Sequence, residues 1–257
     1  SINLNAVDIS IIKIFENNIP QFLQENNLSG DNELRRVAKP IVQKTLRLDD
    51  DKTLDLHKRQ HFSLDIDKFL KTEQGAIYKV TIGFRPEYSL YLSSDTANKS
   101  VAAEDEEEDY YRSYDDYSGG NGVDEDDAFW DRYNTYYPFG YNWQRRDDPT
   151  SKSYYNKDRW ATRNILASNI GLTAKRGNNN SLTVAVSNIL TTEPMGDVEI
   201  EIMDYQRVII NQAKSGNDGF ANIDLKRKPF LLIAKKGNER GYLKLDDGNS
   251  LPLSRFD

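Results

Sequence analysis

Residues 163–257 alternate apolar and polar side chains in short runs, and this alternation is the feature that most constrains the fold. A period of two places successive side chains on opposite faces of a β-strand. The alternation is clear at 182–186 and 198–202, and further short runs at 170–175, 208–210, 220–225, 230–234 and 242–245 bring the predicted strands to about seven. Short strands spaced about eight to twelve residues apart are typical of an antiparallel β-sandwich, which is the fold we predict here.

The stretches between these runs are rich in residues that form turns. They lie at 176–180, 193–196, 216–219 and 236–238, and they contain Gly, Asn, Asp and Pro. Gly, Asn and Asp tolerate a positive φ, whereas Pro presets a negative one, so these clusters favour reversals of the chain. They support an antiparallel arrangement of the seven strands.

Residues 1–96 contain similar but less regular runs. Alternation predicts strands at 7–11, 61–66, 77–84 and 88–92, and Ile12, Ile14 and Phe15 shift the phase of the first, as a bulge or an internal twist would. The stretch 34–48 fits helical spacing, yet it contains Pro40, which would break a helix interior. We therefore expect 34–48 to be extended and the first part to form a second sandwich.

The middle part, residues 97–162, lacks strand-like alternation and carries the negative charge of the chain. The whole chain has a formal charge of −7, whereas residues 104–131 hold thirteen acidic residues and one arginine, a local charge of −12. A nucleic-acid surface needs clustered Lys and Arg with interleaved aromatic residues. The most charged region here has the opposite sign and would repel phosphate, so we expect no nucleic-acid partner.

Aromatic residues follow the acidic run. A solvated linker is normally poor in aromatic side chains. We therefore expect an interdomain docking role for five of them: Phe129, Trp130, Tyr137, Phe139 and Trp143. The alternative is a solvated low-complexity segment with no role of its own.

Few residues in the chain are suited to catalysis or metal binding. The sequence has no Cys and two His, which excludes disulfides, thiolate metal cages and a cysteine nucleophile. His57 and His61 would face one metal if they lay on a helix, but the residues that follow predict a strand. The acidic residues at 115, 116 and 124–127 lack the alternating Asp-x-Asp-x-Asp-Gly pattern of a calcium-binding loop. We predict no catalytic residue, no metal site and no cofactor, and we see neither a signal peptide nor a membrane span.

The third part resembles a macroglobulin domain of the bacterial alpha-2-macroglobulin family. The resemblance rests on the order and spacing of ASNIGLTAKRG (167–177), LTVAVSNILTTEPM (182–195), SGNDGFA (215–221), LIAKKG (232–237), YLKL (242–245) and LPLSRFD (251–257). The first part is similar to the preceding macroglobulin domain through FENNIPQFLQ (15–24) and EQGAIYKV (73–80). The acidic, tyrosine-rich middle departs from the shorter linkers of better-known members.

This resemblance implies an all-β chain: two macroglobulin-like, immunoglobulin- or fibronectin-like antiparallel sandwiches over 1–96 and 163–257, joined by the acidic, aromatic-rich segment 97–162. It implies a fragment of a large cell-envelope protein, periplasmic or at the cell surface, that inhibits proteases by entrapment. Its partners would be proteases, through the full-length protein, and neighbouring macroglobulin domains of the same chain. Many members acylate the protease through a thioester in a Cys-x-Glu-Gln motif, and this chain without Cys cannot perform that step.

Two other function classes remain open from the sequence. One is a β-sandwich adhesion or ligand-binding module at the cell surface, in which the aromatic and acidic middle part grips a ligand. The other is a calcium-dependent accessory module. A tight peptide or glycan ligand would favour the first, and a rise in melting temperature with calcium would favour the second, because a ligand that binds only the folded state stabilises it.

Overall fold

The computed structural model describes residues 3–91, 129–130, 133, 137–138, 140–177 and 180–246. The chain divides into two compact units, each assembled from several stretches of sequence. The first unit comprises Ser1–Ile12, Lys39–Leu70 and Lys79–Arg163. The second comprises Lys13–Ala38, Lys71–Tyr78 and Asn164–Asp257, so two N-terminal segments fold together with the C-terminal strands.

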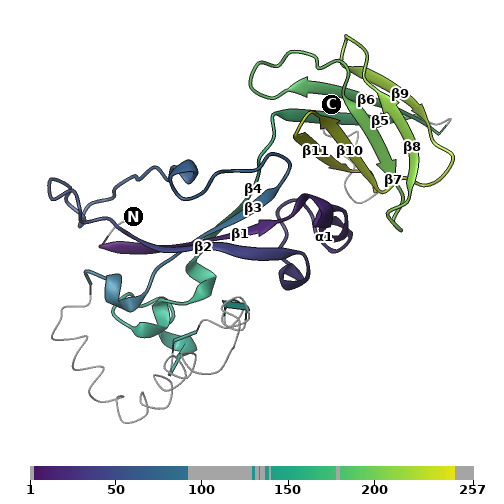
Figure 1. Cartoon of the computed structure of the whole chain (residues 1–257). Helices are drawn as coiled ribbons and strands as arrows, with labels where there is room; N and C mark the ends of the chain where they lie inside the picture. The colour runs from purple at the N-terminus through teal and green to yellow at the C-terminus, as the bar shows by residue number, and fades with distance from the viewer. Residues whose placement is uncertain are drawn as a thin grey trace, which may run out of the picture. The chain divides into compact units, whose positions relative to one another are not determined.

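The all-β class is confirmed, with three sheets among the described residues. One sheet has the order β2-β1-β3-β4 and consists of β1 (Ala6–Ile14), β2 (Ala38–Arg47), β3 (Ile77–Gly83) and β4 (Ala161–Leu166) (Figure 1). In the described residues the N-terminal strands form this one sheet. We expected a separate sandwich over residues 1–96. The structure instead shows a single sheet here, and its fourth strand, β4, follows the middle segment in sequence.

The strand β2 confirms that the stretch 34–48 is extended rather than helical. A short 3₁₀ turn, Leu34–Arg36, precedes it, and the strand then runs through Pro40. Pro cannot donate a hydrogen bond to a sheet ladder, so within sheets it is confined mainly to edge strands. β2 lies at the edge of its sheet, which explains how the strand accommodates this residue.

The strand predicted at 61–66 is wrong. The stretch is irregular and leads into a 3₁₀ turn, Ile66–Lys68. Aspartates in this region accept backbone N–H bonds from residues two positions ahead: Asp51 from Thr53, Asp55 from His57 and Asp65 from Asp67. Such local bonds offer the backbone an alternative to a sheet ladder, and here they outweigh the apolar alternation.

The strand predicted at 88–92 is reduced to an isolated bridge. A 3₁₀ turn covers Pro86–Tyr88, and among the residues described up to 91 the chain then pairs with the N-terminus through the antiparallel bridge between Leu4 and Ser89. The backbone N–H of Asn5 donates to the Tyr88 carbonyl at 2.9 Å. Pro86 favours the turn because it is suited to a first helical position, where its missing N–H costs nothing.

The seven strands predicted for the third part are confirmed, and they form two antiparallel sheets (Figure 1). The first sheet has the order β5-β6-β9, and the second has the order β11-β10-β7-β8. Their bounds are β5 Ile170–Arg176, β6 Ser181–Asn188, β7 Glu199–Met203, β8 Ile209–Lys214, β9 Phe220–Asp224, β10 Leu231–Lys236 and β11 Glu239–Lys244. The register is continuous in the β5–β6 pair, from Ile170 opposite Asn188 to Arg176 opposite Leu182.

The alternation read in the sequence becomes a buried core between these sheets. In β6, Leu182, Val184 and Val186 are buried, whereas the residues between them are partly exposed. They join one cluster with residues of the second sheet, including Ile200 and Leu232. Burial of a large aliphatic side chain contributes about 1.5–3 kcal/mol, so this cluster is the main source of stability of the sandwich.

One short helix, α1 (Ile19–Glu25), belongs to the second unit. It begins with Pro20 in its first turn and buries Ile19, Phe22 and Leu23. The remaining short turns are 3₁₀ helices at Glu16–Asn18, Trp143–Arg145, Lys152–Tyr154 and Lys157–Arg159. No helix within the described part of the chain has the length and apolar character needed to cross a membrane.

Candidate functional site

The aromatic residues predicted to dock lie in different environments. Phe129 and Trp130 are each 8% exposed. Their ring centroids lie 5.2 Å apart, and both rings also contact the ring of Tyr133. Tyr137 and Trp143 are exposed. Phe139 lies outside the described residues. The structure therefore groups Phe129 with Trp130 inside the first unit, and it leaves Tyr137 and Trp143 at the surface.

The segment that carries Trp143 is fastened to the first unit by a buried tyrosine. Tyr155 is 1% exposed, and its hydroxyl contacts the Ser89 hydroxyl at 2.5 Å and the Pro149 carbonyl at 2.7 Å. Its ring packs edge-on against Phe84. Burial raises the pKa of this hydroxyl above its ordinary value, so Tyr155 stays protonated and able to donate.

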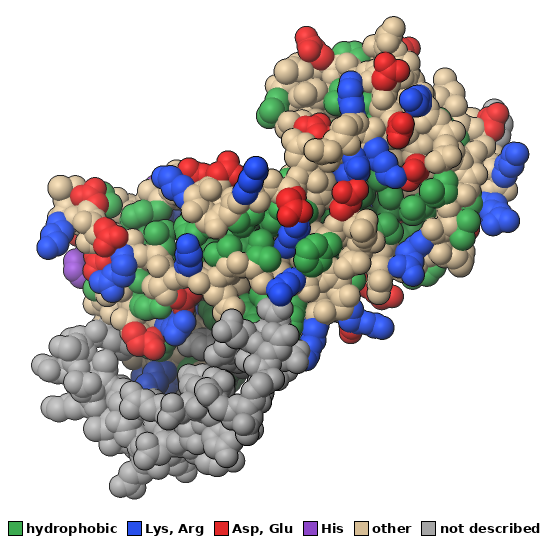
Figure 2. Space-filling view, in the orientation of Figure 1, with side chains coloured by type: hydrophobic (Ala, Val, Ile, Leu, Met, Phe, Trp, Pro, Cys, Tyr) green, Lys and Arg blue, Asp and Glu red, His purple; other side chains and the backbone are tan. Residues whose placement is uncertain are grey.

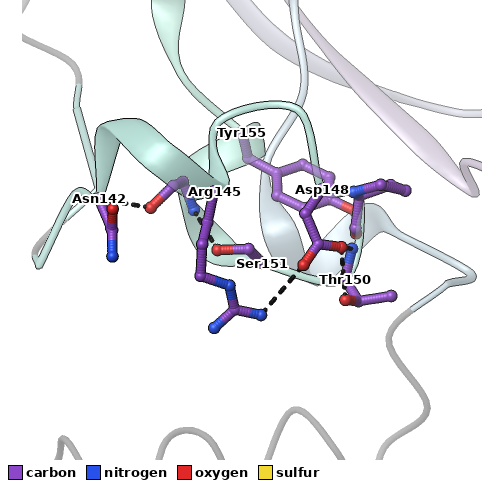
Figure 3. A network of polar contacts seen from close by, with 8 residues as sticks. Asn142, Arg145, Asp148, Thr150, Ser151 and Tyr155 are labelled. Carbon is purple, nitrogen blue, oxygen red and sulfur yellow. Dashed lines mark hydrogen bonds and ion pairs between the residues drawn. The ribbon is translucent and has the colours of Figure 1, made fainter.

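Local polar contacts hold the turns of this segment (Figure 3). Asn142 accepts from the Gln144 backbone, and Arg145 pairs with Asp148 at 3.1 Å. Asp148 also accepts bonds from the backbone and the hydroxyl of Thr150, and these bonds lower the pKa of its carboxyl. Side chains that cap turns in this way fix the backbone, so the segment presents its surface residues in a defined arrangement.

Stacked cation–aromatic pairs cover the outside of this segment. The guanidinium of Arg146 lies 3.8 Å from the ring centroid of Trp143, which is 62% exposed. Arg159 lies 4.0 Å from the Tyr154 ring and donates to the Arg146 carbonyl. Trp, Tyr and Arg are the residues most enriched at the energetic centres of protein interfaces. The surface is therefore suited to contact a protein partner.

A second feature, which the sequence did not predict, joins N-terminal segments to the last strand of the sandwich within the second unit. We call it the docking seam, and it comprises Glu16, Asn26 and Gly75 with Arg240, Tyr242 and Lys244 of β11. The hydroxyl of Tyr242 donates to the Gly75 carbonyl at 2.9 Å. Tyr242 is 5% exposed, and burial raises its pKa far above the ordinary value. The phenol is therefore neutral and remains a donor.

The conformation of Gly75 makes this contact possible. Its φ is +82°, a region that side chains other than glycine rarely adopt. A Cβ at this position would lie 2.5 Å from Cγ of Arg240. The backbone N–H of Gly75 donates to the Ala167 carbonyl at 2.8 Å, and the Ala167 N–H donates to the Ala76 carbonyl at 3.2 Å. The chain after β4 is thereby paired with the residues before β3.

Charged side chains of β11 complete the docking seam. Arg240 Nε contacts Glu16 Oε1 at 2.7 Å, and the Arg240 side chain is 18% exposed. Lys244 Nζ donates to the Asn26 carbonyl at 3.1 Å, close to the end of α1. A partly buried, charge-assisted bond is stronger than an exposed ion pair, so these contacts fix the segment around α1 against the sandwich.

The residues considered for metal binding do not form a site in the described part of the chain. Nδ1 of His57 lies 2.9 Å from Oδ1 of Asn3, while His61 lies in the irregular stretch before Ile66. No group of three or more His, Asp or Glu residues is arranged to hold a metal among the described residues. The acidic residues at 115, 116 and 124–127 lie outside the described residues.

Comparison with known proteins identifies the sandwich. The two-sheet, seven-stranded antiparallel fold of β5–β11 first places it among the immunoglobulin-like β-sandwiches. Residues 167–257 match the family model of the bacterial alpha-2-macroglobulin MG3 domain. The match supports the resemblance read in the sequence: these residues are similar to a macroglobulin domain of the bacterial alpha-2-macroglobulin family.

Two solved structures share the fold at a TM-score of 0.50, and a third is less similar. A crystal structure of native alpha-2-macroglobulin from Escherichia coli spanning domains NIE-MG1 matches at a TM-score of 0.50 and 14% identity, over 95% of this chain and 85% of that one. A cryo-EM reconstruction of the native E. coli protein matches with a TM-score of 0.50 and 15% sequence identity. The match covers 95% of this chain and 11% of that one. A crystal structure of the E. coli protein spanning domains MG0-NIE-MG1 matches with a TM-score of 0.47 and 15% sequence identity. The match covers 95% of this chain and 56% of that one. The search of curated proteins found no match.

Proposed function

We propose that the chain is a non-catalytic structural and interaction fragment of a large alpha-2-macroglobulin-like endopeptidase inhibitor. In the full-length protein, that inhibitor would entrap proteases. The observation that carries the proposal is the match of residues 167–257 to a macroglobulin domain of this family. The location would be the bacterial cell envelope, either the periplasm or the cell surface. The partners would be proteases, reached through the full-length protein, and neighbouring macroglobulin domains.

The docking seam supports a scaffold role. A protein that encloses a protease needs domains held in defined positions, since loosely linked domains would leave the protease accessible. Tyr242, Arg240 and Lys244 fasten two N-terminal segments to the sandwich through bonds of 2.7–3.1 Å. This arrangement makes the second unit a rigid building block. The chain contains no Cys, so a thioester would have to be supplied by another part of the protein.

An entrapment assay on the full-length protein tests this proposal. A protease that is enclosed loses activity on a large protein substrate but keeps activity on a small peptide substrate, which still diffuses to its active site. We expect this split with the full-length protein, its loss when residues 1–257 are deleted, and no inhibition by the 257-residue chain alone. Equal loss of activity on both substrates, or no effect of the full-length protein, would contradict entrapment.

We also propose that the exposed part of the predicted aromatic group, Tyr137 and Trp143, contacts a neighbouring macroglobulin domain. Trp143 is 62% exposed, and the guanidinium of Arg146 stacks on one face of its ring. The ring is therefore already held in place, so a partner that binds its exposed part loses little side-chain entropy. Trp143→Ser in the full-length protein should increase proteolytic cleavage between domains, whereas Tyr91→Ser, another exposed aromatic position, should not. An unchanged cleavage pattern in Trp143→Ser would contradict this contact.

The division of the chain at 97 and 162 is part of the same proposal. We expect limited proteolysis to cut first within 104–162 and to leave the later strands intact. A first cut inside residues 170–244 would contradict it.

A further inference from the structure

The outer face of the β5-β6-β9 sheet and the loop after β6 carry exposed apolar side chains. Core residues alternate with outward-facing ones in both β6 and β9, and Ala185 lies opposite Phe220 on the outer face. Pro194 reaches the same sheet through an isolated bridge to Ser187. We call this surface the outer patch, and it comprises Gly171, Ala185, Ile189, Leu190, Pro194 and Phe220.

The largest side chains of the outer patch are open to solvent. Leu190 is the most exposed large apolar side chain among the described residues, at 75%, and Ile189 and Phe220 are 56% and 50% exposed. Ile189 lies over Gly171, since a Cβ on that glycine would be 2.9 Å from Cγ2 of Ile189. Exposed apolar surface of this kind is unfavourable in water, and a partner that covers it gains free energy.

The loop that carries Ile189 and Leu190 is held in one conformation. Oδ1 of Asn188 accepts from the backbone N–H groups of Leu190 and Thr191 at 2.9 and 3.2 Å. The Asn188 carbonyl accepts from the Thr192 N–H at 2.8 Å. Thr192 has a φ of +62°, which a β-branched residue rarely adopts unless its surroundings enforce it. The two apolar side chains are therefore presented in a fixed position, which lowers the entropic cost of binding.

The opposite face of the sandwich is already in contact with the rest of the second unit. In β10, Leu232 and Ala234 belong to the core between the sheets, so Leu231 and Ile233 point outward. Both are nevertheless buried, at 0% and 5% exposed. Tyr242 lies opposite Ile233 and belongs to the docking seam. This face is thus used for contact with N-terminal segments, whereas the apolar side chains of the outer patch remain exposed.

Charge narrows the choice of partner. The six residues of the outer patch are all uncharged, whereas Figure 2 shows acidic and basic side chains interspersed over the described residues of the face in view. An anionic membrane or a nucleic acid is attracted by Lys and Arg, and neither is among these six residues. The centres of protein interfaces, by contrast, are depleted of charge. The outer patch therefore fits an uncharged apolar surface on another protein domain.

The size of the outer patch indicates that this domain belongs to the same polypeptide. A fully buried aromatic side chain contributes about 150–250 Å², and Phe220 is only half exposed. Together with Ile189, Leu190 and Pro194 it falls well short of the roughly 800 Å² per partner that a stable interface between separate proteins buries. A tethered domain needs less area, because the link raises its effective concentration to about the millimolar range.

We propose that the outer patch is the surface through which this sandwich contacts a neighbouring macroglobulin domain of the same polypeptide. Leu190 and Phe220 form the centre of the contact, and the partner presents an uncharged apolar surface to them. This inference rests on the proposed function, since it requires the chain to be part of a longer protein with several domains.

Thiol labelling tests the proposal, because the chain has no cysteine of its own. Leu190→Cys is made in the 257-residue chain and in the full-length protein, and its reaction with N-ethylmaleimide is followed by peptide mass spectrometry. Val208→Cys is the control, since Val208 is an apolar residue of the same unit and is 51% exposed. We expect labelling of Leu190→Cys to be roughly tenfold slower in the full-length protein, because the centre of an interface excludes solvent. The rates for Val208→Cys should agree within about twofold in the two proteins.

Phe220→Cys provides a second, independent measurement and should be slowed in the same way. Equal rates in the two proteins at either Leu190 or Phe220, or equal slowing of the Val208 control, would overturn the proposal. Protection in the 257-residue chain that grows with its concentration would also overturn it, because the occupant would then be a second copy. The entrapment assay on the same full-length protein separates the two proposals: entrapment with equal labelling rates refutes the outer patch alone, and slowed labelling without entrapment refutes the inhibitor role alone.

Discussion

Removal of one hydroxyl group tests whether the docking seam stabilises the second unit. In Tyr242→Phe the ring is kept, but the bond to the Gly75 carbonyl is lost and this buried acceptor is left without its partner. An unsatisfied buried polar group costs about 1–3 kcal/mol. At pH 7 we therefore expect the free energy of unfolding to fall by about 1–3 kcal/mol.

The same substitution changes how stability depends on pH. Burial raises the pKa of Tyr242 in the folded state above its ordinary value of 10.0. Above pH 10 the unfolded chain loses this proton while the folded chain keeps it, so stability falls as the pH rises. The slope from one such group approaches about 1.4 kcal/mol per pH unit. Tyr242→Phe should remove this contribution, so the wild-type curve should be steeper than the variant curve above pH 10.

Urea denaturation followed by circular dichroism measures both effects, and hydrogen exchange of peptides covering 71–78 localises them. We expect faster exchange of these amides in Tyr242→Phe than in the wild type. Tyr205→Phe is the control, because it removes a hydroxyl from a tyrosine of the same unit that is 51% exposed. Equal unfolding free energies at pH 7 and parallel curves above pH 10 for Tyr242→Phe and wild type would refute the reasoning.

Three further substitutions test other parts of the structure. Gly75→Ala should destabilise by more than 1 kcal/mol by urea denaturation, because its φ of +82° disfavours alanine and its Cβ would meet Arg240; a stabilised variant would contradict the observed turn. Leu232→Ala should cost about 2–5 kcal/mol in the same assay, since the side chain is fully buried in the core between the sheets; a loss below 1 kcal/mol would place it outside the core. Tyr155→Phe should expose residues 140–160 to faster hydrogen exchange through the lost bonds to Ser89 and Pro149; unchanged exchange would show that these bonds do not hold the segment.

The sandwich was predictable because its signal is local. In β6 the buried positions Leu182, Val184 and Val186 alternate with polar or small residues, and the turns on both sides are marked by Gly, Asn or Pro. Each strand can be recognised within a window of five to eight residues, and burial on one face then fixes the register. The match to a known domain family depends on the same residues.

The sheet of the first part was only partly predictable. In β4, Ala161–Leu166, four of the six residues are exposed, Ile165 among them, and Asn164 and Leu166 are only partly buried, so the strand lacks the apolar alternation that reveals a half-buried strand. The stretch 61–66 has the alternation, yet the Asx turns of Asp51, Asp55 and Asp65 organise this region differently. A prediction based on the spacing of apolar residues detects neither local side-chain hydrogen bonds nor the pairing of a strand at a sheet edge.

The docking seam was not predictable, because its contacts join residues far apart in the chain. Tyr242 and Gly75 are separated by 167 positions, and Arg240 and Glu16 by 224. A tyrosine in a strand and a glycine in a turn are common, so neither residue signals the contact on its own. Of the aromatic residues expected to dock, Phe129 and Trp130 are buried within the first unit, and the role of Tyr137 and Trp143 remains a prediction.

The position of β4 beside β3 has a consequence for engineering. The two strands are neighbours in one sheet, although residues 84–160 separate them in sequence. Since closing a loop costs only about 0.6 kcal/mol for each doubling of its length, the sheet tolerates excursions of very different size at this point. The pairing of β3 with β4 therefore depends on contacts between the strands themselves rather than on a short connection, so a circular permutation that links them directly should preserve this sheet.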